Sequence, residues 1–210
     1  MKLLWSSRSP FARKAMVAAH EAGVADRIVT ERVVVSASKT NPDVMAVNPL
    51  NKIPTLVLDD GTTLYGSAVI CEYLDSLHDG PKLFPADPAA RWPALKRQAL
   101  GDGLMELGIL RLGEQYRPAA MQSESQLATY RGKIGSGLDR IEAEGLSLAK
   151  GLGAAGGADI GHVAIGCALG YLDFRFGADD WRHGRPKLSA WYAEFARRPA
   201  MRATEHVDIQ

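Results

Sequence analysis

The stretch Leu3–His20, LLWSSRSPFARKAMVAAH, contains the signals for a strand, a serine-rich turn and the start of a helix. Its first three residues are apolar and predict a buried strand. Pro10 suits the first turn of a helix, because its missing N–H would have no intrahelical partner there, and Ser9 stands directly before it in the N-cap position. Apolar residues then recur at helical spacing until Gly23. The stretch therefore predicts a strand that leads through three serines to the N-terminus of a helix.

These serines, Ser6, Ser7 and Ser9, lie where negative charge is favoured. Unpaired backbone N–H groups and the helix dipole both attract anions to a helix N-terminus. A serine before a proline is also a common helix cap, worth about 1 kcal/mol, and as a cap it implies no chemistry. From this stretch alone both interpretations remain open.

Length and charge narrow the classes of protein to which the chain can belong. With 210 residues it can form one large domain or two small ones. Its 25 basic and 24 acidic residues give a net charge of +1, so electrostatics provide no case for binding nucleic acid or an anionic membrane. No apolar run reaches the length of about 18 residues that a membrane span needs, and the N-terminus has no apolar signal core. We expect a cytoplasmic protein.

Cysteine and histidine usage gives no sign of a metal centre. Cys71 and Cys167 are too far apart for a disulfide framework or a zinc site, and each lies in an apolar helical stretch. We expect buried free thiols, consistent with a reducing cytoplasm. None of the five histidines has a cysteine, histidine or acidic residue at ligand spacing, so no metal is expected.

The first 78 residues predict a small mixed sheet. A strand, a helix and a second strand form one unit, and such a unit requires a parallel strand pair. A turn signal, Asp59–Gly61, then joins two further strands antiparallel, and a helix follows. The expected strands after the first are Ile28–Val35, Thr55–Leu58 and Thr63–Tyr65, and the expected helices after the first are Asp43–Val47 and Ala68–Leu77.

Strand signals disappear after this part of the chain. Residues 79–87, DGPKLFPAD, contain two prolines and a glycine and form the best boundary. The fold class is therefore α/β followed by all-α, with domains 1–78 and 89–210 and a linker at 79–88. Helices are expected over Arg91–Tyr116, Ser123–Glu144, Asp159–Phe176 and Pro186–Arg198, with a glycine-rich loop at Lys150–Gly157.

Four motifs occur together in register over nearly the whole chain. They are Ser6–Lys14 (SSRSPFARK), Asn48-Pro49 with Lys52-Ile53-Pro54, Ser67–Ile70 before Tyr73-Leu74, and Ala158-Asp159-Ile160. In these motifs the chain resembles the cytosolic glutathione transferases, and among them the bacterial, serine-type members. The resemblance implies a thioredoxin-like N-terminal domain, a C-terminal helical bundle domain and a homodimer.

The resemblance also implies a reaction, in which glutathione is the co-substrate and a small electrophile is its partner. A hydroxyl that donates a hydrogen bond to the glutathione sulfur favours the thiolate, and a helix N-terminus adds to that effect. Ser9 matches the Ser-Pro-Phe arrangement of serine-type classes, Ser6 matches the position of another serine class, and Ser7 is a third candidate. Serine rather than cysteine at position 9 argues against disulfide exchange, which needs a protein thiolate.

Five further residues take glutathione-binding roles by the same resemblance. Lys52 would reach the glycyl carboxylate, and a cis-Pro54 would turn the Ile53 backbone toward the cysteinyl group. Ser67 would bind the γ-glutamyl carboxylate, and Asp102 would reach its amine. Each also has an ordinary structural explanation: a surface lysine, a proline that enters an edge strand, a helix cap, or an aspartate bonded in the core.

One departure from the family pattern keeps other functions open. Gly66 stands where many members have Glu or Asp before the serine, so one polar contact to glutathione is missing. This glycine favours a non-catalytic interaction or regulatory protein with the same fold, whereas the serines and the Lys52–Pro54 motif favour an enzyme. Glutathione-dependent reduction of hydroperoxides at the same site is the alternative within enzymes.

Several residues outside these motifs are also assigned roles from the sequence. Asp159 is expected to cap the most apolar helix, His162 to be bonded within the core, and Arg13 to form an ion pair. Tyr171 and Trp181 are candidates for lining the electrophile pocket, although aromatic residues of a helical domain more often lie in its core.

Overall fold

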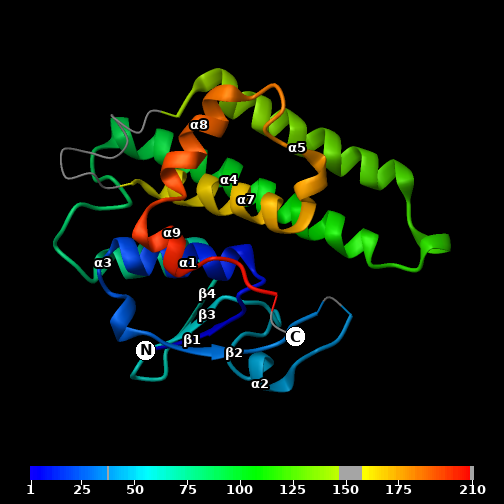
Figure 1. Cartoon of the computed structure of the whole chain (residues 1–210). Coiled ribbons are helices and arrows are strands. Elements are labelled where there is room, and N and C mark those ends of the chain that lie inside the picture. Colours follow the sequence, from blue (N-terminus) through cyan, green and yellow to red (C-terminus); the bar gives the residue numbers. More distant parts are fainter. Residues whose placement is uncertain (37, 147–157, 209–210) are drawn as a thin grey trace.

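The computed structural model describes residues 1–36, 38–146 and 158–208 (Figure 1). The glycine-rich loop predicted at 150–157 lies outside the described residues.

The first part of the chain forms the predicted four-stranded mixed sheet, with strand order β2-β1-β3-β4. Strand β1 pairs parallel with β2 and antiparallel with β3, and β3 pairs antiparallel with β4. At the hairpin, the Leu58 N–H donates to the Thr62 carbonyl (2.8 Å), and Gly61 adopts φ +87°. The second strand is shorter than expected, since it ends at Arg32. The strands are β1 Lys2–Trp5, β2 Val29–Arg32, β3 Thr55–Val57 and β4 Thr63–Tyr65.

Local capping signals fix the starts of the helices in this part. The Ser9 hydroxyl oxygen accepts a hydrogen bond from the Ala12 N–H (3.2 Å), as the N-cap prediction requires. The helix predicted from Ala68 begins after Gly66, which adopts φ +87°, a conformation that side-chain-bearing residues rarely take. The helices are α1 Pro10–Glu21, α2 Pro42–Met45 and α3 Ser67–Ser76, with a 3₁₀ turn η1 at Ala25–Arg27.

The rest of the described chain is helical, as predicted. Helix α7 is buried along most of its length and packs closely against α4: a Cβ on Gly101 would lie 2.6 Å from the Ala164 carbonyl carbon. A last short helix, α9, was not predicted from the sequence. The helices are α4 Pro88–Gln115, α5 Glu124–Glu144, α7 Ile160–Phe176, α8 Pro186–Phe195 and α9 Pro199–Ala203, with 3₁₀ turns η2 Ala119–Met121 and η3 Gly177–Asp179.

Helix α1 lies between the sheet and the long helices α4 and α7 (Figure 1). Met16 and Ala19 pack with β1, β3 and α3 in one apolar cluster. Val17 and Ala18, on the other side of α1, belong to the larger cluster built from α4, α5, α7 and α8. The same helix therefore joins the two cores.

Two of the structural roles assigned from the sequence are confirmed and one is wrong. Asp159 caps α7: its carboxylate accepts from the His162 N–H (3.0 Å), and His162 is buried beside it. Arg13 does not form the expected ion pair among the described residues. It is buried and donates from Nη2 to the Met201 carbonyl in α9 (3.1 Å), so a backbone acceptor takes the place of the expected carboxylate.

Cys71 and Cys167 are buried free thiols, as predicted. Burial is the main cause that raises the pKa of Cys71 to about 12 and the pKa of Cys167 to about 11. Within the described residues, none of the helices combines the length and the apolar composition that crossing a membrane would require.

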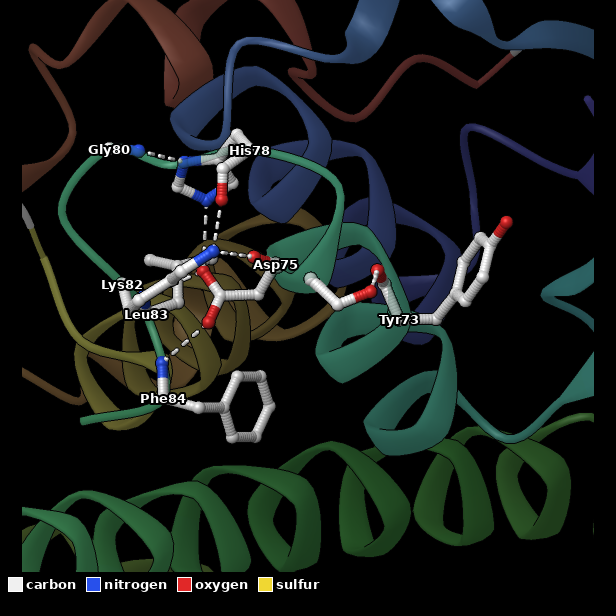
Figure 2. Close-up of polar contacts among 8 residues, drawn as sticks. Tyr73, Asp75, His78, Gly80, Lys82, Leu83 and Phe84 are labelled. Carbon is white, nitrogen blue, oxygen red and sulfur yellow. Dashed lines mark hydrogen bonds and ion pairs between the residues drawn. The ribbon is translucent and has the colours of Figure 1, made fainter. Parts of the chain in front are cut away.

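Asp75 holds the segment that connects α3 to α4 (Figure 2). Its carboxylate accepts from the backbone N–H groups of Leu83 (2.8 Å) and Phe84 (3.0 Å), and it contacts His78 Nε2 at 3.1 Å. The side chains of Leu83 and Phe84 then join the core of the helical part. The division at 79–88 into linker and domains stays a prediction.

Replacing Asp75 by Ala should lower the stability of the fold. Two buried N–H groups would lose their acceptor, which costs about 3 kcal/mol and lowers Tm by roughly 6–12 °C. Thermal unfolding followed by circular dichroism measures the shift. Asp79→Ala is the matched control, since Asp79 is exposed in the same segment. Equal Tm values for the two variants would contradict the role given to Asp75.

Candidate active site

A cavity of about 1200 Å³ opens where the first part of the chain meets α4 and α7. Five of the residues predicted to activate or bind glutathione line it: Ser6, Ser9, Lys52, Ile53 and Asp102. They come from the turn before α1, the segment before β3 and the middle of α4. Three other predicted residues, Ser7, Pro54 and Ser67, are not among the lining side chains.

The hydrogen bonds of the three early serines distinguish them chemically. The oxygens of Ser9 and Ser6 act as acceptors, from the N–H groups of Ala12 (3.2 Å) and Arg8 (3.3 Å), so the O–H of each serine is still available to donate. Ser7 instead donates its proton to the Val207 carbonyl (2.8 Å). Ser6 and Ser9 are therefore the hydroxyls that can donate to a ligand in the cavity.

A buried amide holds the segment before β3 in place. Asn48 Nδ2 donates to the Lys52 carbonyl (3.0 Å) and to Thr55 Oγ1 (2.9 Å). The Ile53-Pro54 peptide bond is cis, as predicted. In the sequence Asn48 is recognisable only as part of a motif, whereas in the structure it orders the segment that carries Lys52 and Ile53 to the cavity.

Ser67 begins α3 and is buried. Gly66 before it is the N-cap residue and offers no side-chain cap. The space around a Cβ at Gly66 is open, so its positive φ, rather than crowding, is the structural reason for a glycine at this position.

Asp102 lines the cavity but is already bound by a lysine. Lys14 Nζ, fully buried in α1, lies 2.6 Å and 2.8 Å from the two carboxylate oxygens of Asp102. Burial raises the pKa of Asp102, and the Lys14 charge opposes that shift. The Asp102 side chain is 26% exposed, so one side still faces the cavity. Sequence reasoning placed Asp102 on an inner face but did not identify Lys14 as its partner.

The walls of the cavity carry more positive than negative charge. Basic side chains come from four segments of the chain. The two acidic side chains both lie on α4, and Lys14 neutralises that of Asp102. Such a wall favours anionic ligands. The basic lining residues are Arg8, Arg32, Lys39, Lys52 and Arg175, and the acidic ones are Asp102 and Glu106.

Of the two aromatic residues predicted to line the pocket, only Tyr171 lines this cavity. Tyr171, on α7, lines the cavity, and burial raises its pKa to about 12, so it stays protonated at neutral pH. Trp181 does not line this cavity. It is buried, donates from Nε1 to Asp173 (2.7 Å) and faces a separate, smaller cavity instead.

The C-terminal segment braces the serine turn, which no signal in the sequence indicated. His206 Nδ1 lies 2.8 Å from the Ser7 carbonyl, and because a carbonyl only accepts, Nδ1 carries the proton. The His206 ring also stacks on Phe174 of α7, with 4.9 Å between ring centroids. With the Ser7–Val207 bond, these contacts hold the turn before α1 from outside the cavity.

Two family models match this chain. One, described as "Glutathione S-transferase, N-terminal domain", matches residues 8–77, and the other, "Glutathione S-transferase, C-terminal domain", matches residues 124–194. Together they include Ser9, the segment before β3 and α7.

Full-length relatives agree with these matches. The chain is 35% identical over 205 residues to the Escherichia coli (strain K12) protein named "Uncharacterized GST-like protein YibF", with 98% of both chains covered. A glutathione transferase family member from Pseudomonas fluorescens Pf-5, solved with bound glutathione, is 39% identical with a TM-score of 0.91, and 98% of each chain is covered. A glutathione S-transferase from Methylobacillus flagellatus KT, solved with glutathione bound, is 34% identical with a TM-score of 0.82, covering 98% of this chain and 99% of that one.

The contact between His206 and Ser7 predicts that the stability of the fold varies with pH through the titration of His206. Burial, with the charges of Arg13 and Arg175, lowers the pKa of His206 from 6.5 to about 4, although the Ser7 carbonyl opposes the shift. The folded protein thus binds this proton less tightly than the unfolded chain does, so stability is present above pH 6.5 and is lost as pH falls toward 4. Between pH 7.5 and pH 5 the loss should be about 2 kcal/mol.

His206→Asn tests this prediction, because its amide keeps a donor for Ser7 but does not titrate. Urea unfolding at pH 7.5 and pH 5 measures the free energy of unfolding of both proteins. The wild type should lose about 2 kcal/mol more than the variant over this interval. The same loss in both proteins would show that His206 is not the group responsible.

Proposed function

We propose that this chain, which belongs to the glutathione S-transferase family, activates the thiol of glutathione for attack on a small electrophile. The main observation in support of the proposal is the position of Ser6 and Ser9 in the turn before α1. At the N-terminus of α1, Ser9 and Ser6 each present a free O–H donor to a cavity that Lys52 and Ile53 also line. A site of this kind favours an ionised sulfur over a neutral thiol.

The reaction needs the glutathione thiol to lose its proton to solvent. A free thiol has a pKa near 8.5, so only a few per cent is ionised at neutral pH. A hydrogen bond from Ser9 and the N–H groups of the first turn of α1 would stabilise the thiolate, and each unit of lowered pKa corresponds to about 1.4 kcal/mol. The thiolate then forms a bond to the electrophilic carbon as the leaving group departs with its electron pair.

The glutathione-binding roles are part of this proposal. Lys52 would pair with the glycyl carboxylate, and the Ile53 backbone, after which Pro54 is cis, would pair with the cysteinyl group. Ser67 would bind the γ-glutamyl carboxylate at the start of α3. Asp102 is the weakest of these candidates, because Lys14 already engages both of its carboxylate oxygens.

We further propose a serine-type enzyme that detoxifies electrophiles in the cytoplasm. Serine at position 9 leaves no protein thiol in the turn, which argues against disulfide exchange. The two buried free thiols, Cys71 and Cys167, fit a reducing compartment.

A homodimer is the assembly that the exposed apolar side chains favour. Trp92, near the start of α4, is 68% exposed, and Val69 of α3 and Tyr65 of β4 are exposed as well. The ion pair between Arg91 and Glu72 (2.7 Å) brings these segments of α4 and α3 together. Exposed aromatic side chains that gather in this way are typical of a surface that a protein partner covers.

Retention on immobilised glutathione and a conjugation assay with chlorodinitrobenzene test the proposed function. We expect retention and conjugate formation. Turnover of cumene hydroperoxide in place of conjugation would favour the peroxidase alternative. Neither retention nor turnover of any electrophile would favour the non-catalytic interaction protein.

Ser9→Ala should lower kcat for conjugation about 10- to 100-fold with little change in glutathione affinity, because the hydroxyl acts on the sulfur rather than on the carboxylates. The thiolate absorbance near 240 nm, followed against pH, should show a raised pKa for bound glutathione. Ser76→Ala is the matched control, since the Ser76 hydroxyl donates to the Tyr73 carbonyl at the end of α3, outside the cavity. An unchanged rate in Ser9→Ala would transfer the role to Ser6.

The double variant Val69→Glu, Trp92→Glu should be monomeric. Two carboxylates on the proposed interface would be desolvated on assembly, at a cost of several kcal/mol. Light scattering should then give 22.7 kDa for the variant and twice that mass for the wild type. Met121→Glu is the control, because Met121 is exposed in η2, away from this surface. A monomeric wild type would rule out the homodimer.

A further inference from the structure

Arg175, near the C-terminal end of α7, is a shielded cation without a close carboxylate. Its side chain is 12% exposed, and its nearest carboxylate among the described residues, Asp208, lies 3.9 Å away. Its Nε is buried and has no hydrogen-bond partner in the described part of the chain. Arg111 and Arg198 have close carboxylates, in Asp179 and Glu21, whereas Arg13 shares with Arg175 a buried Nε without a partner among the described residues. The compensation of Arg175 comes instead from the Phe174 ring, whose centroid lies 4.0 Å from the guanidinium carbon, and from the Tyr171 hydroxyl, so the cation has room for a closer carboxylate.

Arg8 and Arg175 share the carboxylate of Asp208. Arg8 Nε lies 2.7 Å from Oδ1 of Asp208, and Arg175 Nη1 lies 3.9 Å from Oδ2. Both arginines line the cavity, and Arg8 directly precedes Ser9. The chain's own C-terminal segment thus places a carboxylate between two guanidinium groups beside the serine turn.

Asp208 is held loosely, although the segment before it is fixed. His206 and Val207 bind Ser7 by hydrogen bonds of 2.8 Å each. The Asp208 side chain is 58% exposed, and Arg8 is exposed too, so the ion pair between them contributes little to stability. A carboxylate from a ligand could replace that of Asp208 at little cost, while His206 and Val207 keep their contacts with Ser7.

We propose that Arg8 and Arg175 bind a carboxylate of the electrophilic substrate, and that Asp208 occupies this position until the substrate displaces it. The inference rests on the proposed function and adds a substrate class: small electrophiles that bear a carboxylate. Planar guanidinium groups match carboxylates in both charge and geometry.

The position of Arg175 favours the electrophile over the carboxylates of glutathione as the ligand. Arg175 lies on α7 together with Tyr171, on the helical side of the cavity. The residues proposed for the two glutathione carboxylates, Lys52 and Ser67, lie in the first part of the chain, before β3 and at the start of α3. The two ligands would therefore meet across the cavity.

A matched pair of electrophiles tests the inference: 4-chloro-3,5-dinitrobenzoate and its methyl ester, which lose chloride in the same substitution but differ in charge. The readout is the ratio of kcat/KM for the acid to kcat/KM for the ester. Arg175→Gln and Arg8→Gln should each lower this ratio about tenfold, and Arg175→Lys should restore part of it. Asp208→Asn should raise the ratio a few-fold by removing the internal competitor. Arg140→Gln, which removes an exposed charge of α5, should leave it unchanged.

Two results would overturn the inference. One is a ratio that stays within twofold of the wild type in both Arg175→Gln and Arg8→Gln. The other is a raised KM for glutathione with both electrophiles, since the arginines would then bind the tripeptide.

Failure of the proposed function would look different, because the wild type would turn over neither electrophile. In that case the glutathione conjugates of the acid and the ester, prepared chemically, replace them in calorimetric titrations. Tighter binding of the acid conjugate that Arg175→Gln abolishes would support the arginine pair. Equal affinity of the wild type for the two conjugates would overturn it.

Discussion

Burial of α1 on both sides is the constraint on which the rest of the structure depends. Small side chains on this helix allow the sheet and α3 to approach one side and α7 to approach the other. A helix so enclosed can carry charge only if that charge is compensated, and Lys14 and Arg13 are bound by Asp102 and by the Met201 carbonyl. Because α1 is fixed along its length, its N-terminus with Ser9 is fixed where the cavity opens.

Features determined by neighbouring residues could be predicted from the sequence. The Ser9 cap, the Gly61 turn and the Asp159 cap each depend on residues a few positions apart, and all three occur as expected. The parallel pairing of β1 with β2 followed from the chain order of strand, helix and strand, since a helical crossover requires a parallel pair. The strand after η1 was overestimated because its β-branched run continues beyond Arg32, where pairing with β1 stops.

Contacts between distant residues explain what the sequence did not predict. Lys14 and Asp102 are 88 positions apart, and His206 reaches Ser7 across 199 positions, so no spacing rule connects them. Such pairs appear only when the helices are packed. They also change the interpretation of the site: Asp102 looked available to a ligand on its helix, whereas in the fold it serves first to neutralise Lys14.

The two thiols of the chain are protected from the chemistry proposed for the cavity. Electrophiles that react with glutathione also alkylate protein cysteines, and the reactive species is the thiolate in both cases. Because burial raises the pKa of both thiols well above their usual range, the reactive thiolate is disfavoured at neutral pH. Neither side chain lines the cavity, and both are fully buried. If the proposed function holds, the burial of both thiols would protect the protein from alkylation by its own substrates.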